Sequence, residues 1–322
     1  MVQLNKITKG LNANIFAKLE FLNPSGSVKD RMALFIIEDA ERKGLLKPGG
    51  TIVENSSGNT GAALAMIAAV KGYKCIITMP DKMSEEKINL MKAFGAEVVI
   101  TPTDVPHDSP ESYYSVARKI AQETPGSFYP DQYNNPRNID AHYYSTGPEI
   151  WKQTGGKIDY FIAGIGTGGT LSGAGKFLKE QKPSLHIIAV DPEGSVFYNY
   201  FKTGQLCKPH VYKVEGIGED YLVKAVDFSI IDNIVQVSEK ESFLMTRRLA
   251  REEGIFAGGS SGSVVLAAIK VAEEQKKQKK QKDIVVVLPD SGTRYLSKLY
   301  NDNWMKTNGF LEYKEDMNET KI

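Results

Sequence analysis

The chain has 322 residues, 41% of them hydrophobic, and a formal net charge of +1. This length suggests two domains with a large buried core, and the near-neutral charge gives no general attraction to nucleic acid or to an anionic membrane, so we expect neither as a partner. Cys75 and Cys207 lack CxxC spacing and the four histidines are scattered, which indicates no disulfide framework and no metal site. No signal sequence opens the chain, and its longest apolar run, residues 62–70, is too short to span a bilayer. We therefore expect a cytoplasmic location.

The first predicted elements place one lysine, Lys29, at the start of a helix. Residues 15–21 alternate apolar and polar side chains and predict a half-buried strand, and five residues downstream share one helical face: Met32, Ala33, Ile36, Ile37 and Ala40. Between them, Pro-Ser-Gly-Ser at residues 24–27 favours a turn, and either serine can cap the helix. The positive helix end and partial burial favour a neutral amine at Lys29, the form that can condense with an aldehyde. The alternative is an ordinary surface lysine beside Asp30 and Arg31.

Two later segments place a loop of small residues between a strand and a helix. Residues 54–61 follow an apolar start at residues 51–53, and residues 163–173 follow a predicted strand at 160–162. Such loops present free backbone N–H groups and hydroxyls to a carboxylate or a phosphate. The second loop lacks the Gly-Lys-Ser/Thr ending of a Walker loop, and its glycine spacing does not fit the dinucleotide fingerprint. The alternatives are a helix cap without a ligand for the first loop and a tight turn or close helix packing for the second.

The rest of the chain alternates strands and helices. Buried strands are predicted at residues 75–79, 97–101, 160–165, 186–191 and 284–288, and helices at 84–94, 112–123, 169–180 and 239–253. This order predicts an α/β fold with largely parallel sheets, in which a ligand binds beyond the carboxyl ends of the strands. Lys29, Asn59 and Gly166 all lie at such ends, which indicates one shared site. A basic run at residues 276–282 is interpreted as the solvated end of a helix, and the tail from Asn308 as loose.

Four motifs follow one another along the chain: Asn-Pro-Ser-Gly-Ser-Val-Lys-Asp-Arg at 23–31, Ser-Gly-Asn-Thr-Gly at 57–61, Gly-Thr-Gly-Gly-Thr at 166–170 and Gly-Gly-Ser-Ser-Gly at 258–262. Together they resemble the fold type II pyridoxal-phosphate enzymes, and within these the cysteine synthase and cystathionine β-synthase group. The resemblance covers nearly the whole chain and implies two α/β/α domains with largely parallel sheets. It implies a smaller mobile domain at residues 32–131, a larger domain at residues 1–31 plus 132–322, and a cofactor site at their interface.

The resemblance also implies a role for each motif. Lys29 would bind pyridoxal 5'-phosphate covalently and later remove the α-proton of the substrate, and Asn59 would bond the phenolic oxygen of the cofactor ring. Ser260 would face the pyridine nitrogen. The phosphate would be held by Gly166, Thr167, Gly168, Gly169 and Thr170. The substrate carboxylate would be bound by Ser56, Ser57, Thr60 and Gln132.

Three of these assignments have their own chemistry. A serine hydroxyl at Ser260 can donate to an unprotonated pyridine nitrogen, which makes the ring a weaker electron sink than an aspartate would and favours reaction at the β-carbon. Residues 258–262 are equally compatible with a helix start. The amide of Gln132 suits a carboxylate, although a loop residue in a turn is the plain alternative. Ser56 stands where the cystathionine synthases usually have threonine, so the hydroxyl is kept and a methyl group is lost.

The implied reaction is a β-replacement on L-serine or an activated serine through an aminoacrylate, in a cleft that closes to exclude water. Several segments, among them Glu-Gly-Ile-Gly at 215–218, look more like cystathionine β-synthase, which would condense serine with homocysteine to cystathionine. The alternatives are a cysteine synthase using O-acetylserine and sulfide, a cysteine-using reaction that releases hydrogen sulfide, and a catalytically silent binding subunit. The expected partners are an amino-acid substrate, a thiol or sulfide, and a second copy of the chain in a homodimer.

Two acids flank the glycine turn that the resemblance places at the mouth of the active site. Glu215 and Asp220 could orient the amino group of homocysteine or assist deprotonation of its thiol, or they could be solvated loop acids. The sequence also departs from the group at its ends. The Gly-Asn-Thr-Pro-Leu type segment that usually precedes the stretch matching Val2-Gln3-Leu4 is missing, which shortens a piece that often helps dimerisation. Nothing matches the haem-binding extension or the regulatory module of longer cystathionine synthases, so haem and adenosylmethionine control are not expected.

Overall fold

The computed structural model describes residues 1–106, 108–275 and 281–312. Its strands form a six-stranded sheet in the order β1-β2-β10-β7-β8-β9 and a four-stranded sheet in the order β5-β4-β3-β6. Among the strands of the described residues, every neighbouring pair is parallel except β1 and β2. The predicted α/β fold with largely parallel sheets is therefore confirmed.

The larger sheet is covered by helices on both faces. Its strands are β1 (Val2–Gln3), β2 (Ala13–Leu19), β7 (Tyr160–Gly164), β8 (His186–Pro192), β9 (Asn233–Val237) and β10 (Lys282–Leu288). Because successive side chains point to opposite faces, Ile162 and Val286 pack toward α9 (Glu239–Glu253) and α10 (Gly259–Glu274), whereas Phe161 and Val285 pack toward α6 (Gly147–Thr154) and α7 (Gly169–Gln181). Burial on both faces explains why these strands read as nearly continuous apolar runs.

The smaller sheet has its own core. It contains β3 (Thr51–Asn55), β4 (Lys74–Pro80), β5 (Glu97–Thr101) and β6 (Ser127–Phe128). Side chains of β3 and β4, such as Ile52 and Ile77, pack with α1 (Lys29–Arg42), α2 (Asn59–Lys71) and α3 (Glu85–Ala93). On the other side lies α4 (Tyr113–Glu123), which contacts β3 and β4.

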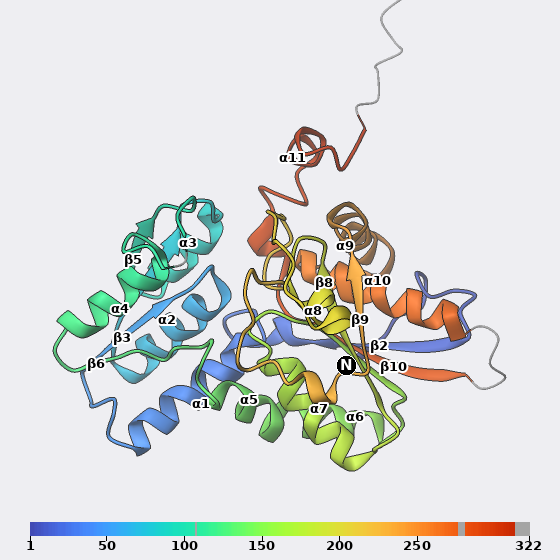
Figure 1. Ribbon diagram of the computed structural model, residues 1–322, viewed down its shortest axis with the longest axis horizontal. Helices are drawn as coiled ribbons and strands as arrows, with labels where there is room; N and C mark the ends of the chain where they lie inside the picture. Colours follow the sequence, from blue (N-terminus) through green and yellow to red (C-terminus); the bar gives the residue numbers. More distant parts are fainter. Residues whose placement is uncertain (107, 276–280, 313–322) are drawn as a thin grey trace, which may run out of the picture.

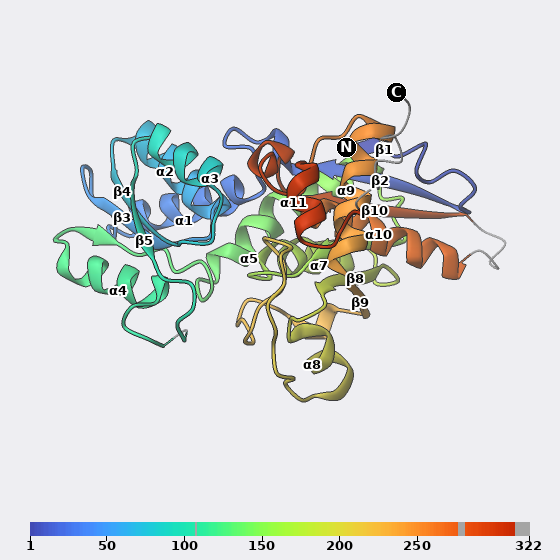
Figure 2. The same ribbon diagram turned by 90° about the horizontal axis from the view of Figure 1, so that it is seen from above.

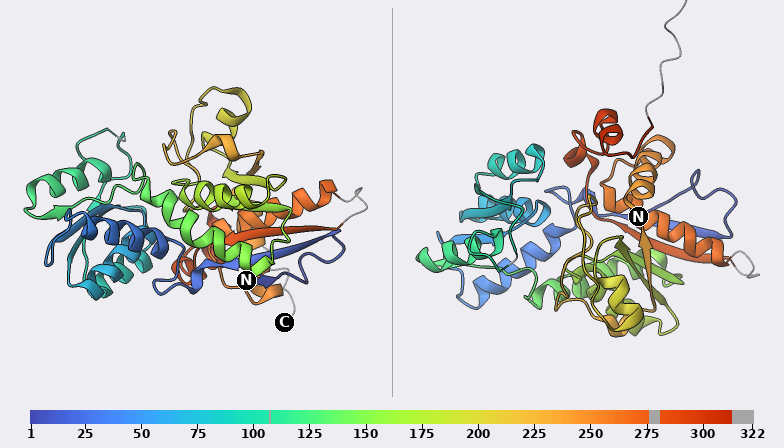
Figure 3. Two further views of the ribbon diagram at one scale, coloured as in Figure 1. Left: turned by 90° about the horizontal axis from the view of Figure 1, so that it is seen from below. Right: turned by 45° about the horizontal axis from the view of Figure 1, so that its top comes forward.

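The remaining helices are short: α5 (Arg137–Ala141), α8 (Phe197–Thr203), α11 (Asp302–Thr307), the 3-10 turns η1 (Glu20–Leu22), η3 (Phe228–Ile230) and η5 (Gly292–Tyr295), and a π-helical turn η2 (His142–Thr146). Figures 1 and 2 show the two sheets with their helices as separate lobes, with α1 and α5 between them, and both views in Figure 3 agree. The domain bounds at residues 31/32 and 131/132 stay a prediction.

The predicted elements are found within a few residues of their expected ends. The predicted strand at 15–21 ends at Leu19 because the chain turns into η1, where the buried Glu20 forms an ion pair with Arg31. The predicted serine cap of α1 is not found, because the N-cap residue is Val28, which makes no side-chain capping bond. Ser27 Oγ instead accepts from the backbone N–H of Lys29 at 3.3 Å, and the Ser25 hydroxyl donates to Asp30. Residues 276–280 of the basic run and the tail beyond residue 312 lie outside the described residues. Where these segments are described, both predictions are wrong: Lys282 begins β10 rather than ending a helix, and the tail from Asn308 is not loose, because Phe310 is buried against Phe243 and Trp304. Within the described ranges, no helix combines the length and apolar character needed to cross a bilayer.

Candidate active site

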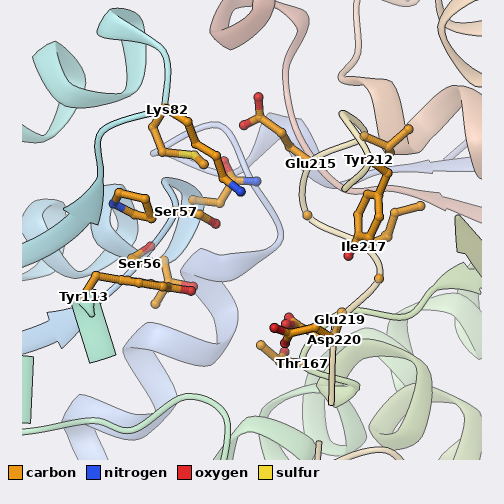
Figure 4. Close-up of a pocket in the computed structure, with 18 of the residues that line it drawn as sticks. Ser56, Ser57, Lys82, Tyr113, Thr167, Tyr212, Glu215, Ile217, Glu219 and Asp220 are labelled. Atoms are coloured by element: carbon orange, nitrogen blue, oxygen red, sulfur yellow. The ribbon is translucent and has the colours of Figure 1, made fainter. Parts of the chain in front are cut away.

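A cleft of about 440 Å³ lies between the two lobes. It adjoins a smaller cavity, and the two share several lining residues, among them Lys29, Gly166 and Ser260. All of the residues predicted from the sequence line one or both: Lys29, Ser56, Ser57, Asn59, Thr60, Gln132, Gly166, Thr167, Gly168, Gly169, Thr170 and Ser260. Figure 4 shows Ser56 and Tyr113 on one wall and Thr167 with Glu219 on the other. The fold thus brings residues that are far apart in the sequence to one place.

Lys29 is held at the start of α1 by rigid backbone. The preceding turn contains Gly26 at φ +86°, and the backbone N–H of Val28 donates to Pro289 O at 2.8 Å. Burial lowers the pKa of the Lys29 amine, although Asp290 and Glu219 act in the opposite direction. Because the neutral amine is the nucleophilic form of lysine, this position supports covalent chemistry with an aldehyde.

The glycine loop after β7 approaches its surroundings too closely for side chains. A Cβ on Gly166 would lie 2.8 Å from the carbonyl oxygen of Gly216. A Cβ on Gly168, whose φ is +85°, would lie 2.6 Å from Val226 Cγ2. The loop leads into the N-terminus of α7, where the first backbone N–H groups lack helical acceptors, so it forms a cradle for a phosphate. The Thr167 hydroxyl accepts from Asn138 Nδ2 at 3.1 Å and keeps its own hydrogen for an anion.

Ser260 lies in the first turn of α10 and is 2% exposed. It lines both cavities together with Lys29, while the glycine loop at residues 166–170 lines the smaller one. A hydroxyl donor, an amine and a phosphate cradle therefore surround one space. This donor set suits a planar aromatic aldehyde that has a ring nitrogen and a phosphate.

Asn59 lines the cleft, but its side chain is already engaged. Its Nδ2 donates to Asp290 Oδ2 at 2.8 Å, and its Oδ1 accepts from the Arg294 guanidinium. Tyr295 OH also donates to Asp290 Oδ2, at 2.6 Å. One N–H of the Asn59 amide is left for a ligand. The bond from Asn59 to the phenolic oxygen of the cofactor ring stays a prediction, and only this remaining N–H could make it.

The residues predicted to bind a carboxylate also contact one another. Thr60 Oγ1 donates to Gln132 Oε1 at 2.7 Å, and Gln132 Nε2 donates to the carbonyl of Asn55 at 3.1 Å. Ser56 Oγ accepts from the backbone N–H of Gly61 at 2.9 Å, which satisfies one N–H of the first turn of α2, whose N-cap residue is Gly58. Gln132 is therefore more than a residue of a turn, because it ties the chain after β6 to the loop after β3. The roles of these residues toward a substrate stay predictions.

The acidic loop at residues 215–220 differs most from expectation. Glu215 forms ion pairs with Lys87 of α3 and, at 2.7 Å, with Lys298, so it is committed to a structural contact. Asp220 is exposed at the rim. Glu219, which sequence reasoning did not single out, lines the cleft, and Figure 4 shows it beside Thr167. Three acids within six residues were visible in the sequence, but only the fold determines which one faces Lys29.

Burial and the neighbouring Asp220 raise the pKa of Glu219 to about 8, while Lys29 acts in the opposite direction. The opposite wall of the cleft carries two lysines of the smaller lobe, Lys82 and Lys87. Among the described residues, no group of three or more His, Cys, Asp or Glu side chains could hold a metal ion. The site therefore offers an amine, an acid and an anion cradle.

Comparison with known proteins identifies the class of this site. Residues 1–290 match the family model described as pyridoxal-phosphate dependent enzyme. The chain belongs to this family, which confirms the predicted enzyme class and cofactor. Pyridoxal phosphate fits the residues present, since Lys29 would bind its aldehyde, the loop at 166–170 its phosphate and Ser260 its ring nitrogen. When bound, the cofactor supplies an electron sink for charge that develops on the substrate α-carbon.

Individual relatives narrow the comparison. The chain is 50% identical over 314 residues to the cystathionine beta-synthase of Apis mellifera, covering 97% of this chain and 61% of that protein. It is 46% identical over 298 residues to the cysteine synthase of Staphylococcus aureus, covering 92% of each. The chain thus spans about three fifths of the length of the cystathionine beta-synthase. A hydrogen sulfide-producing enzyme from Fusobacterium nucleatum superimposes with a TM-score of 0.84 at 37% identity, covering 92% of this chain and 95% of that one.

Proposed function

We propose that this protein catalyses a β-replacement on L-serine or an activated serine, with homocysteine as the thiol and cystathionine as the product. The proposal depends on the position of Lys29, which lines both the open cleft and the smaller cavity with the glycine loop. Burial there lowers the pKa of its amine. In its neutral form Lys29 accepts the α-proton of the first substrate and later returns it. The hydroxyl-rich loop at residues 56–60 and the amide of Gln132 orient the substrate carboxylate.

The choice of homocysteine is supported by the cystathionine beta-synthases, at up to 50% identity. A specific observation favours a second candidate: the cysteine synthase of Staphylococcus aureus matches this chain over nearly the full length of both proteins. That candidate adds sulfide to O-acetylserine. The Fusobacterium nucleatum enzyme supports a third, in which cysteine is the first substrate and hydrogen sulfide is released.

Visible spectra of the cofactor-loaded protein separate these candidates. Serine, O-acetylserine and cysteine are added one at a time, and the substrate that changes the cofactor absorbance identifies the leaving group. Homocysteine or sulfide is then added, and the one that reverses the change identifies the second substrate. The variant K29A tests the role of Lys29, and we expect its turnover to fall by a factor of at least about 10² to 10⁴. A colourless protein that cannot be reconstituted with pyridoxal phosphate would support the silent binding subunit instead.

Three further proposals rest on the family. The smaller domain, residues 32–131, closes over the cleft and excludes water during the reaction. The chain forms a homodimer, which light scattering coupled to size-exclusion chromatography tests. The protein is cytoplasmic, in keeping with two cysteines that are both free thiols.

A further inference from the structure

Glu219 is an acid of the cleft that takes no part in the proton transfers of Lys29. Its carboxylate lines the cleft, and within the part of the chain that the structure describes it has no hydrogen bond or ion pair of its own. Its neighbours in the loop differ, because Glu215 is held by two lysines and Asp220 faces solvent. Glu219 is half-buried in the wall of the cleft, so a ligand bound there would withdraw its unpaired carboxylate further from water, which singles Glu219 out for a role toward a ligand.

The backbone around Glu219 is fixed. Gly218 N donates to Ile165 O at 2.6 Å, which ties the acidic loop to the strand end before the glycine loop. Glu219 N donates to Ser195 Oγ at 3.1 Å, and Val196 N donates to Glu219 O at 3.1 Å. The position of the carboxylate is therefore set on both sides by neighbouring segments. It lies in the same electrostatic environment as Lys29, and each group shifts the pKa of the other.

We propose that Glu219 accepts the proton of the thiol substrate as the sulfur bonds to the β-carbon of the first substrate; this rests on the proposed function. In this step the S–H bond breaks, its proton moves to the Glu219 carboxylate, and the sulfur electron pair forms the C–S bond. Lys29 returns its proton to the α-carbon, and Glu219 later releases its own to solvent. Lys29 cannot serve both proton transfers at once, and Glu215 is engaged elsewhere.

The electrostatics of the cleft suit this transfer. A pKa of about 8 lies close to that of an ordinary thiol, about 8.5, so the proton moves with little driving force in either direction. The charged groups that act on Glu219 are Lys29, Asp191 and Asp220. Around it lie tyrosines whose pKa values are raised, mainly by burial, so they remain neutral and do not compete as bases: Tyr113, Tyr114, Tyr133, Tyr212 and Tyr221.

The test separates the two half-reactions in the variant Glu219→Gln. The first half, followed by the change in cofactor absorbance on adding O-acetylserine or serine without a thiol, is expected to proceed as in the wild type. The second half, called discharge here, is the reversal of that absorbance change when homocysteine or sulfide is added. It is expected to slow by a factor of about 10² to 10⁴, the usual contribution of a general base. Nucleophiles that are already ionised, azide and 5-thio-2-nitrobenzoate, are expected to discharge both proteins at equal rates. Glu193→Gln, an exposed acid after β8, serves as the matched control.

Further readouts exclude a purely structural effect. Infrared difference spectra of the cofactor-free proteins are expected to show two protonated carboxyls that titrate near pH 8 in the wild type, those of Glu54 and Glu219, and only the Glu54 signal in Glu219→Gln. Asp220→Asn removes a neighbouring negative charge, so the alkaline rise of the thiol step is expected to move to lower pH. Glu219→Asp keeps the acid and is expected to restore part of the rate.

Equal thiol discharge by wild type and Glu219→Gln would overturn the inference, as would equal slowing with azide, which would mean that the variant has damaged the cleft. Failure of any substrate to start the first half in the wild type would instead refute the proposed function. The two failures are therefore distinguishable.

Discussion

The ion pairs of Glu215 provide the sharpest test of how the lobes are held together. Glu215 belongs to the loop of the larger lobe and Lys87 to α3 of the smaller one. The Lys87 side chain is 4% exposed, and Lys298, the other partner, is 22% exposed. In Glu215→Gln, Lys298 can turn to solvent. Lys87 cannot, and it keeps only the carbonyl of Ser57 at 3.4 Å and the Tyr295 ring at 5.1 Å.

The cost follows from leaving one buried charge uncompensated. Removing one partner of a buried ion pair typically destabilises a protein by about 3 to 5 kcal/mol. Replacing both partners by neutral groups of similar shape is often close to neutral. We therefore expect Glu215→Gln to cost about 3 kcal/mol or more, and the double variant Lys87→Met/Glu215→Gln to recover most of that loss. The exposed pair Arg248 and Glu252 supplies the control, because solvent screens this pair and Glu252→Gln should change the free energy of unfolding far less than Glu215→Gln.

Urea unfolding followed by tryptophan fluorescence measures these differences, with the slope m compared between variants. Hydrogen exchange adds a local readout, because loss of the pair should expose the amides of α3 more than those of α9. Although burial favours the neutral acid, Lys87 and Lys298 lower the pKa of Glu215. The contribution of Glu215 to stability is thus present above its pKa in the unfolded chain, and it is lost as pH falls through its lower pKa in the folded protein. A loss in Glu215→Gln no larger than in Glu252→Gln, or a double variant no more stable than the single one, would refute this reasoning.

Three more predictions follow from the site and its supports. Gly168→Ala forces a Cβ against Val226 at φ +85° and should weaken pyridoxal-phosphate binding measured by fluorescence titration, whereas Gly254→Ala, with open space around it, should leave that affinity unchanged. Burial raises the pKa of Glu54 to about 8, so its contribution to stability is complete below pH 4.5 and is lost as pH rises to 8. The free energy of unfolding should fall by up to about 1.4 kcal/mol per pH unit in this range. Urea unfolding at several pH values should show a smaller dependence on pH for Glu54→Gln. Burial, with Lys29 and Arg31, lowers the pKa of His142 to about 3, so its ring should stay neutral at about pH 5 by NMR, and protonation near the ordinary value of 6.5 would contradict its packing.

The local structure of the site could be read from the sequence because it depends on short-range rules. Alternation of side chains identified the strands, and small residues between a strand and a helix marked the loops around Lys29, Asn59 and Gly166. The order of the four motifs was enough to indicate the cofactor, which the family match confirms. Each of these features is encoded within a short run of consecutive residues.

The acids of the cleft could not be assigned in this way. Glu215 bonds to Lys87, which lies 128 positions away in the sequence, and Asn59 bonds to Asp290, which lies 231 positions away. No periodicity within the loop distinguishes Glu215, Glu219 and Asp220, because all three are acidic residues of one turn-rich segment. Which of them meets a lysine, water or the cleft depends on how two sheets pack, and packing is set by contacts between segments that are distant in sequence. The amino-acid order therefore determined the cofactor and the position of Lys29 at the start of a helix, while the tertiary structure alone decided which acid of the loop lines the cleft beside it.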